Sequence, residues 1–177
     1  MESHRHNVVL IGFMGTGKST VGKFLAKQLN WSFTDTDAMI EQKEQMTIAE
    51  MFEARGEAYF RSLETKTIEE LLAEEHQVLA TGGGAVLAEK NRSCMLKNGF
   101  VVAFIASPEA IIRRVSSDQS RPLLQGNLDE RVHSLLEQRK QAYDFAHMTI
   151  DTSELSPERI ARIIMKRLKA IQLKAMP

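Results

Sequence analysis

The residues best suited to chemistry in this sequence form a glycine-rich segment, Gly12–Ser19, with the pattern G-x-x-x-x-G-K-S. Apolar β-formers precede it (Val8–Ile11), and helical spacing follows it (Val21–Leu29). Glycines let consecutive backbone N–H groups surround an anion, and the positive end of the next helix points at the same place. Lys18 can reach terminal phosphate oxygens, and the Ser19 hydroxyl can ligate Mg²⁺. The segment predicts a phosphate-binding loop that holds a nucleotide; a glycine-rich turn without a ligand is the alternative.

Two carboxylates, Asp35 and Asp37, follow a short predicted strand at 32–34. Their spacing points both side chains to the same side while the strand persists. Beside ATP and Mg²⁺, one could hold the metal through water, and the other could accept a proton from the hydroxyl that receives the phosphoryl group. The alternative is a helix cap, which Asp37 could supply before Ala38. The strand at 78–80 has no aspartate at its end, which favours Asp35 as the acidic partner of the metal.

Two further features could recognise a small ligand. Three consecutive glycines, Gly82–Gly84, follow a predicted strand and permit close approach of the backbone; a flexible connection is the alternative. Arg61 has Glu57 four residues before it and Glu64 three residues after it, spacings at which ion pairs can orient a guanidinium group on a helix. An oriented guanidinium suits a carboxylate or phosphate, whereas a surface pair contributes little. The residues alone do not choose between these.

Three more arginines lie in the second half of the chain. Arg121 belongs to a polar stretch, 116–127, which is typical of a lid that closes over a nucleotide; a disordered surface loop is the alternative. Its guanidinium could neutralise charge on the phosphoryl group in transfer, and Arg114 could join it near the nucleotide. Arg139, with Tyr143 four residues later, is placed on a predicted basic helix over 128–145 and is ambiguous by itself.

Strands alternate with helices along the whole chain, which predicts an α/β fold with a mostly parallel sheet covered on both faces. The predicted strands are 8–11, 32–34, 78–80, 100–105 and 148–150, and the longer predicted helices are 21–29, 57–75, 88–97, 128–145 and one that begins at Pro157. Because ligands of such sheets bind beyond the carboxyl ends of the strands, the phosphate-binding loop, the aspartates and the glycines should open onto one crevice. No repeat, linker or domain boundary is evident, so we expect one domain over 1–177.

The composition excludes several classes of function. Lys+Arg and Asp+Glu are equal at 23 each, so no global field favours nucleic acid or an anionic membrane. The single cysteine, Cys94, excludes an internal disulfide and a multi-thiolate metal site, and it fits a reducing cytoplasm. The residues before the first strand lack the apolar region of a signal peptide, and no run is long enough for a membrane span. We therefore expect a cytoplasmic protein, and its small size and balanced charge favour a monomer.

Taken together, these features resemble the shikimate kinase family. The matching motifs, in the order of the family, are Gly12–Thr20, Asp35–Asp37, Gly56–Glu64, Gly82–Gly84, Arg121–Leu124, Arg139 with Tyr143, and Asp151-Thr152 with Pro157. The resemblance implies an adenylate-kinase-like P-loop NTPase fold with three α/β/α layers and a five-stranded parallel sheet in the order 2-3-1-4-5. It also implies a substrate-binding excursion at about 35–62 and a lid at about 116–127.

The activity implied by this resemblance is transfer of the γ-phosphoryl group of MgATP to the 3-hydroxyl of shikimate, which gives shikimate 3-phosphate and ADP on the route to chorismate and aromatic amino acids. Asp37 would be the base that holds the acceptor hydroxyl, and Lys18 and Arg121 would stabilise the phosphoryl group. Ser19 would bind Mg²⁺, with Asp35 supporting it through water. ATP would be bound by Gly15, Thr16, Gly17, Lys18, Ser19, Thr20, Arg114, Arg121 and Pro157. Shikimate would be bound by Asp37, Arg61, Gly82, Gly83, Gly84 and Arg139, with the arginines taking its carboxylate.

Two other classes of function stay open on the sequence. The first is a different kinase on the same fold, acting on gluconate or a nucleoside monophosphate. The second is a nucleotide-dependent binding module that does not catalyse. The presence of Lys18, Asp37 and Arg121 together argues against the second, because a binding module needs no base.

Overall fold

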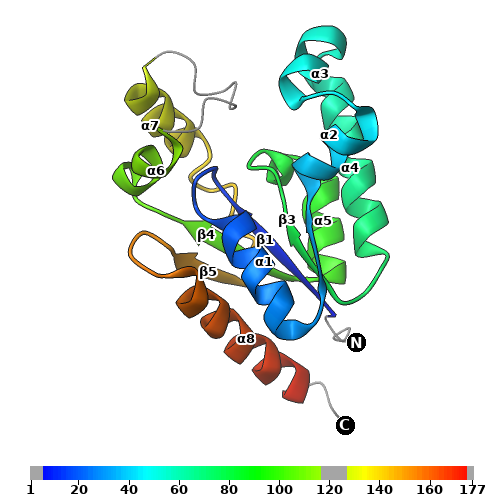
Figure 1. The fold of residues 1–177 in the computed structure, drawn as a ribbon, viewed down its shortest axis with the longest axis vertical. Coiled ribbons are helices and arrows are strands. Elements are labelled where there is room, and N and C mark those ends of the chain that lie inside the picture. The colour runs from blue at the N-terminus through cyan, green and yellow to red at the C-terminus, as the bar shows by residue number, and fades with distance from the viewer. Residues whose placement is uncertain (1–5, 117–126, 175–177) are drawn as a thin grey trace.

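The computed structural model describes residues 6–116 and 127–174 (Figure 1). Within that part of the chain, five parallel strands form one sheet in the order β2-β3-β1-β4-β5, which confirms the predicted order. The strands are β1 (Asn7–Gly12), β2 (Ser32–Asp35), β3 (Gln77–Ala80), β4 (Phe100–Ile105) and β5 (Met148–Asp151). The helices are α1 (Lys18–Leu29), α2 (Thr36–Glu44), α3 (Ile48–Arg55), α4 (Glu57–Leu72), the 3₁₀ helix η1 (Ala85–Leu87), α5 (Glu89–Asn98), α6 (Pro108–Val115), α7 (Leu128–Gln138) and α8 (Pro157–Lys174).

The central strand β1 explains why helices cover both faces of the sheet. Its side chains alternate between the faces, as the geometry of a strand requires. Val8 and Leu10 pack with residues of α1 and α8, whereas Val9 and Ile11 pack with residues of α4 and α5. All four are fully buried, which accounts for the continuous apolar run rather than an alternation of polar and apolar residues.

The carboxyl ends of the strands all face the same edge of the sheet, where the remaining helices rise on two sides (Figure 1). The pair α2 and α3 stands on one side, and α6 and α7 stand on the other, with the loop after β1 between them. Smaller apolar clusters hold each side together: one is centred on Ile40, Met51 and Phe60, and the other on Phe13, Ile111 and Val132. The sheet therefore presents one open edge flanked by two helical walls.

Two predicted helices end earlier in the structure than in the sequence analysis. The prediction over 57–75 is shortened to α4, and that over 128–145 ends at Gln138. After Gln138 the backbone continues as turns, with Lys140 N–H donating to Glu137 O and Ala142 N–H donating to Arg139 O. Such turns bury apolar residues at nearly helical spacing, so periodicity does not distinguish them from a helix.

Among the described residues, no helix is both long enough and apolar enough to cross a bilayer. The predicted lid at 116–127 falls almost wholly outside those residues, as does Arg121. Residues 35–62, predicted to form a substrate-binding excursion, comprise the last residue of β2, then α2, α3 and the start of α4.

Candidate active site

A cavity of about 1040 Å³ lies at the carboxyl edge of the sheet. Its lining brings together every candidate site residue that falls within the described part of the chain, namely Gly15, Thr16, Gly17, Lys18, Ser19, Thr20, Asp35, Asp37, Arg61, Gly82, Gly83, Gly84, Arg114, Arg139 and Pro157. These residues come from the loop after β1, the starts of α1, α2 and α8, the end of β2, the loop after β3, α4, α6, and the turn after α7. The expected common crevice is therefore present.

The loop after β1 ends at the N-terminus of α1, where backbone N–H groups have no partner within the helix. Gly17 precedes the helix in the left-handed region, with φ 97°, which glycine adopts readily and residues with a Cβ do not. Lys18 is 9% exposed, and its Nζ donates to the carbonyl oxygens of Gly12 and Phe13 at 2.8 and 2.9 Å. An ammonium group and a helix N-terminus thus converge where an anion would lie.

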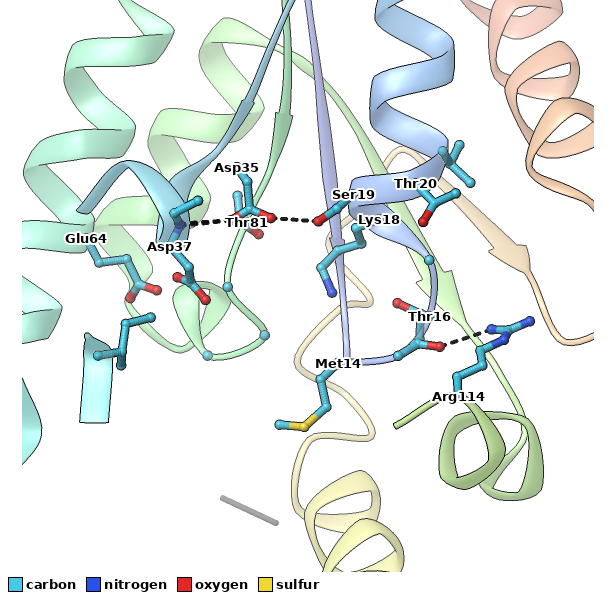
Figure 2. A pocket seen from close by; sticks show the side chains of 18 of the residues that line it. Met14, Thr16, Lys18, Ser19, Thr20, Asp35, Asp37, Glu64, Thr81 and Arg114 are labelled. Atoms are coloured by element: carbon cyan, nitrogen blue, oxygen red, sulfur yellow. Dashed lines mark hydrogen bonds between the residues drawn. The ribbon is translucent and has the colours of Figure 1, made fainter. Parts of the chain in front are cut away.

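Ser19 and Asp35 are in direct contact in the lining of the cavity, where the Ser19 hydroxyl donates to Asp35 Oδ2 at 2.6 Å (Figure 2). The other oxygen, Oδ1, accepts the backbone N–H groups of Asp37 and Ala38 at 3.1 and 3.2 Å. Asp35 is therefore the N-cap of α2, so the cap named as the alternative role of Asp37 is supplied by Asp35 instead. The helix begins at Thr36, so Asp37 is carried by its first turn rather than by a continuing strand.

The oxygens of Ser19 and Asp35 fit a magnesium ion bound together with a nucleotide. Mg²⁺ is usually held by one or two protein oxygens together with phosphate oxygens and water, not by a cage made of protein alone. Residues 6–116 and 127–174 contain no group of three or more His, Cys, Asp or Glu side chains that could hold a metal.

Asp37 is one of two carboxyl groups in the cavity lining whose pKa is raised towards neutral pH. Its Oδ1 is inaccessible to solvent and has no hydrogen-bond partner among the described residues. Burial, followed by the charge of Asp35, raises its pKa from 3.8 to about 6, although Lys18 and Arg61 act in the opposite direction. A carboxylate with this pKa is ionised at neutral pH and is well matched to accept a proton there.

Arg61 is held by the two glutamates that the sequence places around it. Its guanidinium donates to Glu57 Oε1 at 3.1 and 3.2 Å and to Glu64 Oε2 at 2.9 Å. The two pairs are unequal, because the Glu57 side chain is 63% exposed and that of Glu64 only 1%. The buried pair with Glu64 fixes the guanidinium. Burial by itself would lower the pKa of Arg61, but the ion pairs with Glu64 and Glu57 outweigh burial, so the pKa is raised.

Glu64 contributes more to the site than its predicted role as a partner of Arg61. Its Oε1 is buried without a hydrogen-bond partner in the described chain, and burial raises its pKa to about 7 despite the pairing with Arg61. Figure 2 shows its carboxylate beside that of Asp37. A signal was present in the sequence, because Glu64 lies one turn after Phe60 on the apolar face of the predicted helix.

Gly82 lies against both of these carboxylates. A Cβ added there would lie 2.6 Å from Asp37 Oδ1 and 3.1 Å from Glu64 Oε1. Both distances are too short for ordinary contacts, so any larger residue would displace an acidic group. The absence of a side chain at 82 is what lets the two carboxyl groups approach the loop.

Arg139 reaches the cavity from the turn after α7, not from the helix on which it was predicted to lie. Its φ and ψ are −106° and 9°, and the residue is 9% exposed. The guanidinium lies 5.8 Å from the centre of the Phe13 ring, and a Cβ at Gly83 would be 3.4 Å from its Nη1. The end of α7 thus turns a basic side chain inward beside the glycines.

Arg114 fixes the opposite end of the cavity. Its guanidinium donates to the carbonyl oxygens of Gly15, Thr152 and Ser153 at 3.1, 2.6 and 3.2 Å. Thr152 is 1% exposed, and its hydroxyl donates to Thr16 O at 2.7 Å. The phosphate-binding loop is therefore tied to the segment before Pro157, a link that no sequence pattern indicated.

Apolar residues that the sequence analysis did not assign to the site form one wall of the cavity. Ile48, Ala49, Phe52 and Phe60 belong to α3 and α4, and the two phenylalanine rings meet edge to face with centroids 5.2 Å apart. Their helical spacing identified them only as core residues. The wall lies on the same side of the cavity as Arg61, which suits a ligand with an apolar face and a charged end.

The geometry just described is that of a P-loop enzyme. Beside the phosphate-binding loop, the cavity has a second half-site, which is lined by the acidic groups of Asp37 and Glu64 and the basic groups of Arg61 and Arg139. The model of the family described as shikimate kinase matches residues 14–169 of the chain. The chain belongs to the shikimate kinase family. It is therefore an ATP-dependent kinase, and the assignment made from the motifs is confirmed.

Curated relatives named shikimate kinase match most of the chain. The protein from Sulfurihydrogenibium sp. is 44% identical over 163 residues, which cover 92% of this chain and 98% of the relative. The protein from Geobacter sulfurreducens is 47% identical over 157 residues, which cover 88% and 87% of the two chains. The prediction that this chain is a shikimate kinase is thereby confirmed.

Solved structures agree with this family assignment. The shikimate kinase from Acinetobacter baumannii, solved in complex with shikimate, has a TM-score of 0.89 and 38% identity and matches 94% of each chain. A gluconokinase from Sinorhizobium meliloti has a TM-score of 0.63 at 17% identity, covering 97% of this chain and 95% of the other. The second likeness shows only that the fold is shared, so it lends no support to a gluconate substrate.

Proposed function

We propose that this shikimate kinase transfers the γ-phosphoryl group of MgATP to the 3-hydroxyl of shikimate, and that the residues of the cavity described above carry out the transfer. The observation that carries this proposal is the position of Asp37. Its Oδ1 has no hydrogen-bond partner in the described chain, and the carboxyl group is close enough to the lysine of the phosphate-binding loop and to the guanidinium of Arg61 for both positive charges to act on its pKa. A base placed there is adjacent to a donor phosphate on one side and to an anionic acceptor on the other.

The donor side consists of the N-terminus of α1 with its lysine and hydroxyl groups. Backbone N–H groups of Gly15–Thr20 bind the phosphates, and Lys18 leaves its carbonyl partners to contact the terminal phosphate. Ser19 and Asp35 would hold Mg²⁺, the latter through water, and a bound ion would supply positive charge beside the phosphate oxygens. Arg114, already fixed by three carbonyl groups, borders the adenine together with Pro157.

The acceptor side matches a small ring that carries one carboxylate and several hydroxyl groups. Arg61 and Arg139 bind the carboxylate, since guanidinium groups pair with carboxylates through two parallel hydrogen bonds. Phe52 and Phe60 contact the ring, and the Gly82–Gly84 backbone contacts its polar edge. The 3-hydroxyl then lies against Asp37.

The transfer itself depends mainly on positioning and charge, because phosphoryl groups pass through a loose transition state. Asp37 accepts the proton of the 3-hydroxyl as the new O–P bond forms, and ADP leaves with the electron pair of the broken bond. Lys18 and Arg121 stabilise the negative charge of the group in transfer. The segment at about 116–127 acts as a lid that excludes water, which would otherwise compete with the hydroxyl.

The wider setting belongs to the same proposal. The enzyme acts as a cytoplasmic monomer in the route to chorismate, with shikimate and ATP as its partners and without nucleic acid or membrane. The balance of 23 Lys and Arg against 23 Asp and Glu residues supports this setting.

The reaction is tested by identifying its product. The protein is incubated with MgATP and shikimate, and the product is analysed by mass spectrometry and ³¹P NMR, with gluconate and CMP as alternative acceptors. We expect one phosphate on the 3-oxygen of shikimate and no product from the other two. Phosphate on a different oxygen, or turnover of gluconate or CMP in place of shikimate, would refute the proposal.

A further inference from the structure

The segment 82–87, which contains the three glycines and η1, is fixed through its carbonyl groups. Every carbonyl oxygen in it accepts a hydrogen bond from the protein: those of Gly82 and Gly84 from the N–H groups of Ala85 and Leu87, and those of Gly83, Ala85, Val86 and Leu87 from side chains. Three consecutive glycines have the largest conformational freedom of any such segment, so external partners are needed to hold them in one conformation.

Three side chains supply the bonds to the carbonyl oxygens of Gly83, Ala85, Val86 and Leu87, and none of the three lines the cavity. Asn91 Nδ2 donates to Ala85 O at 2.9 Å, and Arg92 Nη1 donates to Val86 O at 2.7 Å and Leu87 O at 3.2 Å. The Tyr143 hydroxyl donates to Gly83 O at 3.0 Å. Asn91 and Arg92 belong to α5, whereas Tyr143 follows α7, so the segment is held from two sides.

Two of these three side chains, those of Asn91 and Tyr143, are buried, so their bonds to the segment are shielded from water. Asn91 is 1% exposed and Tyr143 is 8% exposed. The side-chain amide of Asn91 donates to Ala85 O, while its own Oδ1 is buried with no partner in the described chain. A buried oxygen without a partner lowers stability, so the bond to Ala85 must offset that cost. The Tyr143 phenol also interacts with Arg139, which partly offsets the rise that burial causes in its pKa.

The amide side of the same segment differs from the carbonyl side. Gly83 and Gly84 line the cavity, and no acceptor within residues 6–116 and 127–174 occupies their N–H groups. Both lie against the arginines of the acceptor half-site: a Cβ would be 2.6 Å from Arg61 Nη2 at Gly84 and 3.4 Å from Arg139 Nη1 at Gly83. Carbonyl groups are thus engaged by the protein, and amide donors stay available beside the two guanidinium groups.

We propose that Asn91, Arg92 and Tyr143 are positioning residues for acceptor binding. They hold the backbone of Gly82–Gly84 in the conformation that meets the acceptor, so that ordering of this segment is complete before the acceptor arrives. Without them the glycines must be ordered on binding, which weakens acceptor affinity and leaves the nucleotide half-site unchanged. The inference rests on the proposed function for the identity of the acceptor.

Steady-state kinetics with shikimate and MgATP test this role in Tyr143→Phe and Asn91→Ala. Loss of one neutral hydrogen bond predicts an increase of about five- to tenfold in the KM for shikimate, with the KM for ATP within about twofold of wild type. Arg92→Met should behave in the same way, and Arg92→Lys, which keeps a donor, should restore part of the affinity. An unchanged KM for shikimate, or equal changes in both KM values, would overturn the proposal.

Matched controls separate positioning from general destabilisation. Tyr59→Phe removes a hydroxyl that contacts Glu44 and Arg55, and Asn98→Ala removes an amide that donates to Cys94 O within α5. None of these groups lines the cavity. Both controls should keep the wild-type KM for shikimate, and a rise equal to that in the test variants would contradict the inference.

Hydrogen exchange tests the same idea without any substrate. The N–H groups of Ala85 and Leu87 close the turns of the segment, so their exchange reports its order. We expect at least fivefold faster exchange there in Tyr143→Phe and Asn91→Ala, with the amides of β1 unchanged. If shikimate is not a substrate, the proposed function fails while this readout still decides the role of the three residues; unaltered exchange at Ala85 and Leu87 overturns it.

Discussion

Replacing Asp37 by asparagine should make the free protein more stable while it nearly abolishes turnover. The pKa of Asp37 is raised from 3.8 to about 6, chiefly by burial. The folded protein therefore holds this proton to a higher pH than the unfolded chain. The stability that the protonated group contributes is present in full below pH 3.8 and is lost as the pH rises to about 6. Above that pH, the ionised carboxylate destabilises the folded state by up to about 3 kcal/mol.

Asparagine has nearly the same shape and no charge, so Asp37→Asn removes this penalty. For a chain of this size, 1 kcal/mol shifts the melting temperature by about 2–4 °C. Thermal unfolding of wild type and variant between pH 4 and pH 8 should thus show a difference that is small at pH 4, grows with pH, and levels off above about pH 6. Asp144→Asn, at an exposed position outside the cavity, is the control and should show no such dependence.

In the same variant, kcat should fall by about 10²–10⁴, the usual contribution of a general base, while MgATP binding persists. The reasoning is refuted if the stability difference does not depend on pH, or if Asp37→Asn is less stable than wild type at pH 7.5. Near-normal turnover would separately remove Asp37 from the role of base.

The other predictions concern the residues around Asp37. The Gly82→Ala variant should fold, but its kcat should be about 10²-fold lower, because the added Cβ would lie 2.6 Å from Asp37 Oδ1 and displace the carboxyl group. A wild-type kcat would contradict this prediction. Arg61→Ala should raise the KM for shikimate by about 10- to 100-fold and leave the KM for ATP unchanged, and an unaltered KM for shikimate would remove Arg61 from the site. Ser19→Ala should need about tenfold more Mg²⁺ for half-maximal rate, since it loses an oxygen ligand, whereas Ser19→Thr should not. Finally, kcat/KM for shikimate should rise with pH to a plateau above about pH 6, as Asp37 loses its proton; a rate independent of pH down to pH 5 would exclude Asp37 as the titrating base.

The fold and the nucleotide half-site were largely predictable from local patterns. A phosphate-binding loop is encoded by residues that are neighbours in the sequence, and Val8–Ile11 and Phe100–Ile105 are apolar enough to indicate buried parallel strands. The rule that ligands bind at the carboxyl ends of strands then placed Asp35 and Gly82–Gly84 at one crevice, as the structure shows.

The features that local patterns misplaced or missed depend on the exact path of the backbone or on contacts between distant residues. Whether Asp35 or Asp37 caps α2 depends on where the backbone leaves the strand, which a two-residue spacing does not fix. Arg139 was placed on a helix because turns after Gln138 bury residues at a similar period. Thr152 binds a carbonyl group 136 residues earlier in the chain, a pairing without any local signal.

Glu64 shows the limit most clearly. Its spacing from Arg61 predicted the ion pair, but not the burial that raises its pKa to about 7. That burial arises because α4 packs its buried face towards the glycine segment that follows β3, where Gly82 lies against both acidic groups. Local sequence gives the partner of such a residue, and only the packing of distant elements gives its environment.

The central claim is that this one cavity joins ATP to shikimate. It is tested most directly by a coupled assay of ADP release with MgATP, run with and without shikimate and beside gluconate and CMP. We expect rapid ADP release that requires shikimate, and only background release with the other acceptors. Release that is independent of shikimate, or no release with it despite measurable ATP binding, would contradict the account of the acceptor half-site.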